Sequence, residues 1–510
     1  MAGHNDQREG PSDPELEILA DEPVGELAAE TPADTTRRFR CTDMANARRL
    51  VTQHGNDVRY CHPHKKWLTW AGQRCAFDED GEIERRAKRT VRSIYAEASR
   101  EVQEEVAQTI ANWANLSQSA ARISAMIATA RSEREIVINP ANLDADPMVL
   151  GATNGVVELE TGYIRGPRRE DYITKQAGTE FHPGIQCPNW LSFLDDITDH
   201  DPKLISYLQR VVGYCLTGLT REQVMFILYG KGANGKSVFL RTVGALLGDY
   251  CMITPPETLM TRRNNGGPSP DLARLQGARL VIATEPNEGC VLSETTVKRI
   301  TGQDKIVCRH LYGNLFEYVP QFKVMLATNH KPIIRGDDHA IWRRIHLIPF
   351  DVRFSGSRIN PNLIEQLQSE LRGILYCATK GALEFQKKGL APPKRIVEAT
   401  AEYRADMDVF GDWIEECCVQ DPAAITSVSD LYGPYNEWCR ASGYHPFGMK
   451  RFGMRLADRG YRRVRDSNSR GYAGLSIRAA SKDDNAPDED NTPDENNAPE
   501  EDKLTRKIFG

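Results

Sequence analysis

Short apolar runs recur through the middle of the chain, with helical patterns between them. Residues 224–229, 279–284 and 324–328 are three runs of strand length, and each consists mostly of apolar residues. Residues 238–247 carry apolar residues at helical spacing, and residues 293–302 are predicted to form a helix with Lys298 and Arg299 on its surface. Continuous apolar runs are typical of strands that are buried on both faces of a parallel sheet. The pattern predicts an α/β domain in which helices flank a parallel sheet.

The part of the chain before this domain has a mixed pattern. Residues 85–131 place alanines and charges at helical spacing without a proline, and residues 190–216 again have apolar residues at helical spacing. Between them, residues 150–164 contain two β-rich runs around Gly162, which predicts a hairpin. Residues 59–75 are dense in aromatic residues and predict short strands. We expect a mostly helical α+β domain ahead of the sheet.

The part after the sheet is predicted to be helical and then strongly basic. Predicted helices cover residues 362–388, 399–418, 428–440 and 450–459. Residues 461–477 follow as a two-stranded wing, and residues 440–478 hold one lysine and nine arginines against two aspartates. This pattern favours a winged-helix-like domain with a basic recognition face, whose candidate DNA contacts are Lys450, Arg451 and Arg455. A solvated charged helix is the alternative.

Charge is distributed unevenly along the 510 residues. Residues 1–36 hold ten acidic residues against one arginine, and residues 483–502 hold ten acidic residues and no basic one. Because the whole chain carries a charge of −6, the segment between these tails is basic, which suits a polyanion partner. The tails are poor in aromatic residues, so we expect them to be disordered. A signal peptide and an apolar run of about 18 residues are both missing, which predicts a cytoplasmic protein without a membrane partner.

A glycine-rich segment joins the first apolar run to the helix that follows it. Residues 230–237, GKGANGKS, match the pattern G-x-x-x-x-G-K-[ST]. Glycines let backbone N–H groups turn toward phosphate oxygens, and the N-terminus of the new helix attracts the anion. Lys236 would reach the β- and γ-phosphates, and Ser237 would hold Mg²⁺. The predicted ATP site consists of Gly230, Lys231, Gly232, Ala233, Asn234, Gly235, Lys236, Ser237 and Val238.

Polar residues follow the other two apolar runs. Glu285 comes directly after the second run, where a carboxylate beside a P-loop can manage Mg²⁺ and the attacking water. Asn329 follows the third run, where a neutral amide can contact the γ-phosphate or orient water. Arg343 and Arg344 are candidates for an arginine finger supplied by a neighbouring subunit. A solvated glutamate and a solvated arginine pair are the alternatives.

Basic and aromatic residues also gather on a predicted hairpin at residues 304–318. Lys305, Arg309, His310 and Tyr312 belong to it. Basic and aromatic side chains at the tip of a hairpin suit single-stranded DNA, because its bases stack on aromatic rings and its phosphates attract cations. A plain structural hairpin is the alternative.

The order of these motifs resembles that of the phage and plasmid primase-helicase proteins, whose ATPase belongs to helicase superfamily 3, a branch of the AAA+ class. GKGANGKS resembles the P-loop of this family, and GARLVIATEP (277–286) resembles its Walker B strand. VKRITGQDKIVCRHLY (297–312) is similar to the B-prime motif of the family. LATNHKP (326–332) and DHAIWRRIHLIPF (338–350) resemble its sensor-asparagine and arginine-finger segments. Upstream, residues 153–218 look like the helical domain that precedes the ATPase in this family.

The resemblance implies a P-loop AAA+ ATPase core that uses ATP and Mg²⁺ and works as a ring of subunits. Two departures from the family pattern stand out. Gln303 replaces a glycine of the B-prime motif, which affects the local turn. Larger family members carry a primase-polymerase domain before the helical region, whereas here about forty mostly acidic residues precede it. We therefore expect no primase activity from this chain, and a separate primase or a host replication protein is an expected partner.

The complete prediction is an ATP-dependent DNA helicase that forms a homo-hexamer on single-stranded DNA and forked duplexes during phage, prophage or plasmid replication in a bacterial host cell. An origin-binding or regulatory ATPase that does not unwind processively is the alternative, and an RNA-directed ATPase or a small-molecule kinase comes after it. The predicted segments are an acidic tail (1–40), a helical and mixed domain (41–205), the ATPase (206–355), a helical connector (356–404), a winged-helix-like domain (405–479) and a second acidic tail (480–510).

Overall fold

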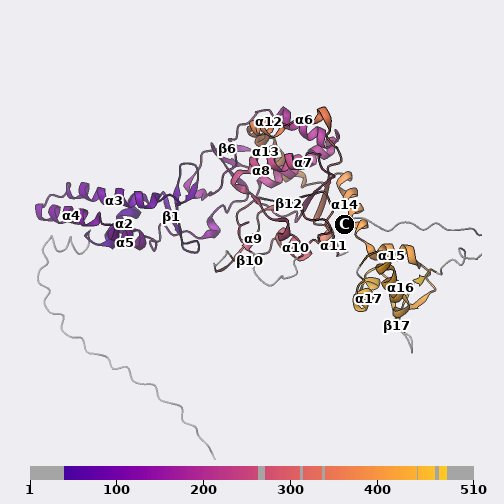
Figure 1. Ribbon diagram of the computed structural model, residues 1–510. Helices are drawn as coiled ribbons and strands as arrows, with labels where there is room; N and C mark the ends of the chain where they lie inside the picture. The colour runs from indigo at the N-terminus through magenta and orange to yellow at the C-terminus, as the bar shows by residue number, and fades with distance from the viewer. Residues whose placement is uncertain are drawn as a thin grey trace, which may run out of the picture. The chain divides into compact units, whose positions relative to one another are not determined.

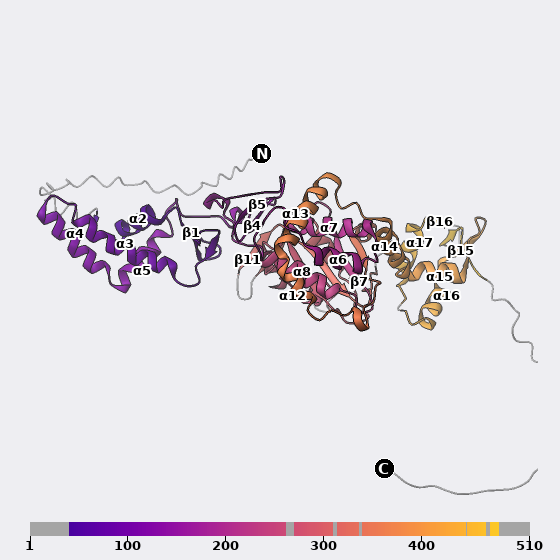
Figure 2. The same cartoon turned by 90° about the horizontal axis from the view of Figure 1, so that it is seen from above.

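The computed structural model describes residues 40–261, 270–309, 314–335, 339–444, 446–465 and 470–478. Contacts divide the chain into two compact units, which join between Arg404 and Ala405 (Figures 1 and 2). Each unit is built around apolar cores of its own. Every helix in the described residues is too short or too polar to span a lipid bilayer.

A five-stranded parallel sheet forms the centre of the first unit. Its strand order is β13-β7-β12-β9-β8. The strands are β7 (Met225–Tyr229), β8 (Cys251–Ile253), β9 (Leu280–Thr284), β12 (Lys323–Thr328) and β13 (Ile345–Pro349). In the pairing of β12 with β7, Val324 lies beside Met225 and Thr328 beside Tyr229. The predicted parallel sheet is confirmed, and the three apolar runs are its three inner strands.

The sequence pattern did not indicate the two outer strands, β8 and β13. β8 has three residues, all apolar and none fully buried, so its apolar run is too short to stand out as a strand. β13 follows two arginines and contains His346, which gives it the appearance of a polar segment. In the fold, burial lowers the pKa of His346 to about 4, and its Nδ1 lies 2.6 Å from the Tyr207 hydroxyl. A neutral imidazole accepts the hydrogen bond from the Tyr207 hydroxyl. His346 is therefore uncharged and has a partner, so β13 can pack in the core.

Helices cover both faces of the sheet. α7 (Pro202–Leu216), α8 (Lys236–Leu247) and α13 (Leu371–Lys388) lie on one side of β12, and α10 (Glu294–Thr301) and α11 (His339–Trp342) lie on the other (Figure 1). α7 and α13 approach backbone to backbone. A Cβ at Gly213 would lie 2.1 Å from the Ala382 nitrogen, and a Cβ at Gly381 would lie 2.1 Å from the Gln209 oxygen. Any larger residue at either glycine would force the two helices apart.

Four segments that were predicted as single helices are interrupted in the structure. The segment 85–131 forms α3 (Glu82–Ala98), α4 (Glu104–Ser117) and α5 (Ala120–Ala130). The segment 190–216 forms α6 (Pro188–Ile197) and α7, and the segment 362–388 forms α12 (Leu363–Ser369) and α13. The segment 399–418 is divided between α14 (Lys394–Asp406) and α15 (Val409–Cys417). Side chains at three of the breaks cap the next helix, because Ser119, Asp201 and Asp408 accept hydrogen bonds from its first N–H groups. Such caps start a new helix and change its direction.

The first unit also contains two small three-stranded sheets. β1 (Val58–Cys61), β2 (Lys66–Trp70) and β3 (Cys75–Phe77) form one antiparallel sheet next to α2 (Asp43–His54). β4 (Val149–Ala152), β5 (Gly155–Glu158) and β6 (Tyr163–Arg165) form the other. The hairpin predicted at residues 150–164 therefore has three strands, since the chain also turns between Ala152 and Gly155.

The second unit combines helices with two small antiparallel sheets. α15, α16 (Val428–Ala441) and α17 (Met449–Asp458) pack around an aromatic core that includes Phe410, Trp413, Tyr435, Phe452 and Tyr472. The larger sheet has the strand order β15 (Ile425–Ser427), β17 (Arg470–Ala473), β16 (Arg462–Arg465). In the smaller sheet β14 (Cys418–Val419) pairs with β18 (Ser476–Ile477). β16 and β17 pair antiparallel in the segment where a two-stranded wing was predicted, and residues 466–469 between them lie outside the described residues. The winged-helix assignment stays a prediction.

Two buried basic side chains make hydrogen bonds at the amino-terminal edge of the central sheet. Arg279 precedes β9 and donates to the carbonyl of Leu216. Lys323 begins β12, donates to the carbonyl of Thr217 and lies 4.6 Å from the centre of the Tyr214 ring. Both carbonyls belong to the C-terminal end of α7, whose partial negative charge attracts cations. The two side chains therefore fix the end of α7 beneath the strands.

Lys323 gives the first unit a pH-dependent stability. Burial lowers the pKa of Lys323 from 10.5 to about 7. The unfolded chain keeps the ordinary pKa, so above pH 7 it binds more protons than the folded chain, and the free energy of unfolding rises with pH. We expect the free energy of unfolding to rise by about 2 kcal/mol between pH 7 and pH 9, and Lys323→Met should remove this rise. Urea denaturation measures it, with the exposed Lys387→Met as control, and an undiminished rise in Lys323→Met would contradict the assignment.

Candidate nucleotide-binding site

The glycine-rich segment lies at the carboxyl-terminal edge of the sheet, between β7 and α8. Gly235 precedes α8 with a φ of +88°, a value that glycine adopts readily and other residues rarely do. A side chain there would also meet α6, because a Cβ at Gly235 would lie 2.7 Å from Cγ2 of Ile197. The predicted order of strand, glycine-rich turn and helix is therefore present, and the N-terminus of α8 is positioned as an anion site.

Lys236 is the first residue of α8, and oxygens surround its ammonium. Its Nζ donates to the carbonyl of Gly230 at 2.5 Å, to Oδ1 of Asn329 at 3.0 Å and to Oδ1 of Asn234 at 3.2 Å. Burial lowers the pKa of Lys236, while the charge of Glu285 raises it. Neutral oxygens offset the cost of burying this cation only in part, so the position favours an anion.

A cavity of about 300 Å³ joins the glycine-rich turn to the ends of two strands. Its lining is residues 232–238 with Thr284, Glu285, Ala327, Thr328 and Asn329. Lys236, Ser237, Glu285 and Asn329 therefore share one cavity, because the carboxyl ends of parallel strands meet at one edge of the sheet. Lys231 is exposed and does not contribute to this lining. Thr284 and Thr328 were missed, since a threonine that ends an apolar strand gives no separate signal in sequence.

The backbone at Glu285 is left-handed, with a φ of +56°. Its N–H donates to the carbonyl of Ala327 at 2.9 Å, which ties the turn after β9 to β12. A left-handed conformation outside glycine is uncommon, and such residues are concentrated at functional sites. The sharp turn leaves the carboxylate exposed on the wall of the cavity.

Asn234 connects the glycine-rich turn to the outer strand β13. Its Nδ2 donates to the carbonyl of Phe350 at 3.0 Å, while its Oδ1 accepts from Lys236. The asparagine is buried and holds the turn against the residue that follows β13. The sequence motif gives no sign of this role, because the partner is more than a hundred residues away.

Arg343 and Arg344 lie at the opposite edge of the sheet. They directly precede β13, which runs parallel to β7, so they are near the start of β7 and the glycine-rich turn follows its end. Arg343 is exposed and donates to Oε1 of Gln223 at 2.8 Å, whereas Arg344 is buried and donates to the carbonyl of Ala340 at 2.7 Å. The structure does not bring these arginines together with Lys236 of the same chain.

The predicted hairpin is present as β10 (Ile306–Arg309) and β11 (Leu315–Tyr318), which pair antiparallel. Lys305 precedes β10, is exposed and lies 3.6 Å from Glu317, and Arg309 is exposed at the end of β10. His310 and Tyr312, which were predicted to contact DNA, lie outside the described residues.

α17 carries the other candidate DNA contacts. Lys450 and Arg451 are exposed on this helix, and the guanidinium of Arg451 lies 4.5 Å from the centre of the Phe447 ring. Arg455 is 8% exposed and also packs over Phe447. Two of the three predicted residues therefore present their charge to solvent, and the third belongs largely to the packing of the unit.

Three family models match successive parts of the chain. "D5 N terminal like" matches residues 47–199, a family of unknown function matches residues 228–344, and "Poxvirus D5 protein-like" matches residues 405–463. The two D5 matches flank the segment that contains the candidate site. The chain is therefore similar to D5-type proteins on both sides of the candidate site. The predicted resemblance to primase-helicase proteins is confirmed.

Proteins that are similar to this chain occur in large DNA viruses. "Putative helicase L207/L206" of Acanthamoeba polyphaga mimivirus is 30% identical over 59% of this chain and 34% of its own length. "Putative helicase 022R" of frog virus 3 is 28% identical over 59% of this chain and 40% of its own length. "Primase D5" of fowlpox virus is 26% identical over 44% of this chain and 30% of its own length. The match spans less than half the length of each of these relatives.

Among solved structures, the apo form of the NrS-1 C-terminal region superposes with a TM-score of 0.47 and 11% identity. The superposition covers 85% of this chain and 98% of that one. A score at this level is too low to establish a common fold.

Proposed function

We propose that the chain is an ATP-dependent DNA helicase of superfamily 3 with an AAA+ ATPase core, acting in the replication of a viral, phage or plasmid genome. The observation that carries this proposal is the single cavity that joins Lys236, Ser237, Glu285 and Asn329. A buried ammonium at a helix N-terminus, next to a hydroxyl and a carboxylate, suits a nucleoside triphosphate with its metal ion.

Each residue of the cavity has a part in the proposed ATPase. The ammonium of Lys236, now held by neutral oxygens, would bind the β- and γ-phosphates. The Ser237 hydroxyl and the Glu285 carboxylate are the hard oxygen donors that Mg²⁺ prefers, so they would hold this ion, which neutralises phosphate charge. Glu285 would also accept the proton of the attacking water, and Asn329 would orient that water or contact the γ-phosphate.

The arginines favour a site that is shared between subunits. Arg343 and Arg344 are at the edge of the sheet opposite to the Lys236 cavity of their own chain. In a ring, that edge of one subunit can face the cavity of the next, and an arginine there would stabilise the charge of the transition state. A homo-hexamer is the assembly that we propose, and Arg343 is the better placed finger because it is exposed.

Two surfaces are proposed to contact DNA. The β10–β11 hairpin would present Lys305 and Arg309 to a single strand. The second unit, which we interpret as a winged helix, would present Lys450 and Arg451 on α17 to phosphates. The second unit also supports the other candidate, an origin-binding ATPase that assembles on DNA without processive unwinding.

Unwinding of a forked duplex tests the proposal and separates the two candidates. We expect ATP hydrolysis that increases with single-stranded DNA and ATP-dependent separation of a fork with single-stranded arms. A fully paired duplex without arms is the control substrate. ATP hydrolysis and DNA binding without strand separation would favour the origin-binding candidate, and no hydrolysis under any condition would refute both.

The α17 surface is tested by reversing its charge. Lys450→Glu with Arg451→Glu should weaken DNA binding by about tenfold or more at low salt, because two phosphate contacts are lost and two repulsive ones are gained. The salt dependence of binding should become shallower, since fewer counterions are released. Lys387→Glu with Lys388→Glu, which reverses two exposed charges on α13, is the matched control. Equal DNA binding by both double variants would remove α17 from the DNA interface.

A further inference from the structure

Two cysteines of the first unit face each other where the start of α6 lies against α13. Cys187 directly precedes α6, and Cys377 lies on α13, 190 residues later in the chain. Both are free thiols, their Sγ atoms are 3.0 Å apart, and a hydrogen bond joins them. The two sulfur atoms of a disulfide are about 2.05 Å apart, so a movement of about 1 Å would be enough to form one.

Close backbone packing holds these two cysteines opposite each other. Gly373 lies one helical turn before Cys377 on α13, so both face the same side of this helix. A Cβ at Gly373 would lie 2.4 Å from the carbonyl oxygen of Gln186 and 3.0 Å from Cβ of Cys187. Any residue with a side chain at this position would push α13 away from the chain before α6. The glycine therefore permits the approach that brings the two thiols together.

A glutamate fixes the start of α6 against the same helix. The backbone N–H groups of Asn189 and Trp190, in the first turn of α6, donate to the carboxylate of Glu370 at 3.1 Å and 3.0 Å. Cys187 occupies the N-cap position of α6, but its side chain makes no capping hydrogen bond. Glu370, at the start of α13, takes that role, and the sulfur of Cys187 bonds to Cys377 instead.

The two thiols differ in exposure and in acidity. Cys187 is fully buried, whereas Cys377 is half-buried. The hydrogen bond from Cys187 and the ammonium of Lys380 lower the pKa of Cys377 to about 7, against the opposing effects of burial and of a nearby carboxylate. The hydrogen bond with Cys377 and burial raise the pKa of Cys187. An accessible, acidic thiol beside a second thiol is typical of cysteines that react reversibly with oxidants.

We propose that Cys187 and Cys377 form a reversible redox site, at which hydrogen peroxide converts the two thiols into a disulfide that ties the start of α6 to α13. The thiolate of Cys377 attacks one oxygen of the peroxide, the O–O bond breaks, hydroxide departs, and Cys377 becomes a sulfenic acid. The thiol of Cys187 then attacks the sulfenic sulfur, the S–O bond breaks, and the released hydroxide takes the proton of Cys187 and becomes water. The two sulfurs together lose two electrons, which reduce the peroxide.

The disulfide would change the stability of the first unit. It would join residues that are 190 positions apart, and closing so long a loop lowers the entropy of the unfolded chain. α6 also packs against the glycine-rich turn, because a Cβ at Gly235 would lie 2.7 Å from Cγ2 of Ile197. Oxidation therefore stabilises the first unit and fixes a helix that adjoins the candidate site.

Oxidation followed by peptide mapping tests the proposal. The full chain is treated with hydrogen peroxide at neutral pH, the remaining thiols are alkylated, and proteolytic peptides are identified by mass spectrometry. We expect peptides joined through Cys187 and Cys377 that separate after treatment with dithiothreitol. The joined chain should melt at least about 5 °C above the reduced chain, because a long loop is closed. Cys290→Ser, which removes another half-buried cysteine, is the control and should form the same bond.

Single substitutions test the order of the two steps, and thermal melting of the reduced variants checks folding. In Cys187→Ala the sulfenic acid on Cys377 has lost the second thiol, so dimedone, a reagent that traps sulfenic acids, should label Cys377. In Cys377→Ser the buried Cys187 should stay a free thiol. A natural chain that forms no bond between the two cysteines, or joins either of them mainly to a third cysteine, would overturn the proposal. A joined chain with an unchanged melting temperature would overturn the tie between α6 and α13.

Discussion

Lys236→Ala is expected to abolish ATP hydrolysis, and Glu285→Gln to retain ATP binding while hydrolysis falls by about 10³-fold or more. The reasons differ. Removing the ammonium deletes the positive charge that Gly230, Asn234 and Asn329 now hold in the cavity, so the phosphates lose their partner. The glutamine keeps the shape of Glu285 and its left-handed turn but cannot take the proton of water.

Nucleotide binding and phosphate release, measured on the same preparations, distinguish these two outcomes. Lys387→Ala removes an exposed lysine on α13 and should leave both quantities unchanged. Hydrolysis at the normal rate by Glu285→Gln would show that another residue activates water, and the assignment of β9 as the catalytic strand would then be wrong. ATP affinity unchanged in Lys236→Ala would place the nucleotide elsewhere in the chain.

The second large effect concerns the interface between subunits. A chain with Arg343→Ala and Arg344→Ala is expected to bind ATP normally and to hydrolyse it about 10³-fold more slowly, because the transition-state charge loses its partner. Mixing this chain with Lys236→Ala protein should restore part of the activity. At a mixed interface in the right order, one subunit supplies an intact Lys236 cavity and the other supplies intact arginines.

Recovery should increase with protein concentration, since it depends on assembly. Single substitutions separate the two arginines. Arg343→Ala should reproduce most of the loss, because Arg343 is exposed, whereas Arg344→Ala should mainly lower stability, because the buried Arg344 donates to Ala340 and Gln223. If mixed assemblies form and no activity returns, the arginines do not complete a neighbouring site.

The three inner strands of the sheet were predictable, because a strand that is buried on both faces must be apolar at nearly every position. β8 and β13 were not, because β8 is only three residues long and the apolar pattern of β13 is interrupted by His346 and preceded by two arginines. Helix boundaries were missed for a related reason. The breaks before α5, α7 and α15 depend on single capping side chains, which apolar spacing does not reveal.

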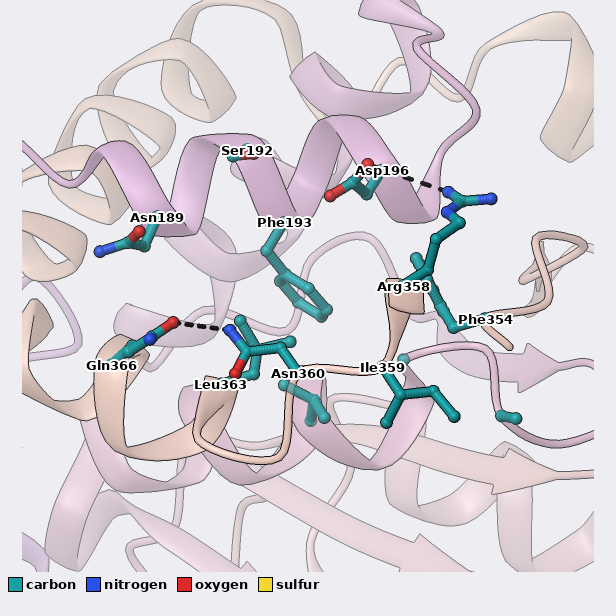
Figure 3. Close-up of a pocket in the computed structure, with 13 residues that line it drawn as sticks. Asn189, Ser192, Phe193, Asp196, Phe354, Arg358, Ile359, Asn360, Leu363 and Gln366 are labelled. Carbon is teal, nitrogen blue, oxygen red and sulfur yellow. Dashed lines mark hydrogen bonds and ion pairs between the residues drawn. The ribbon is translucent and has the colours of Figure 1, made fainter. Parts of the chain in front are cut away.

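For the candidate site, the sequence by itself determined the glycine-rich turn, Lys236 and Ser237, because phosphate binding requires these residue types at fixed local spacing. It also indicated Glu285 and Asn329 as residues that end buried strands. Only the tertiary structure decided that β9 and β12 bring these two to one cavity with Lys236, and that Arg343 lies at the far edge of the same sheet. Only the structure revealed a second cavity beside the glycine-rich turn, whose walls at α6 and residues 354–366 are more than 150 residues apart in sequence (Figure 3). Local spacing encodes a motif, whereas strand order and helix packing are set by contacts between distant residues.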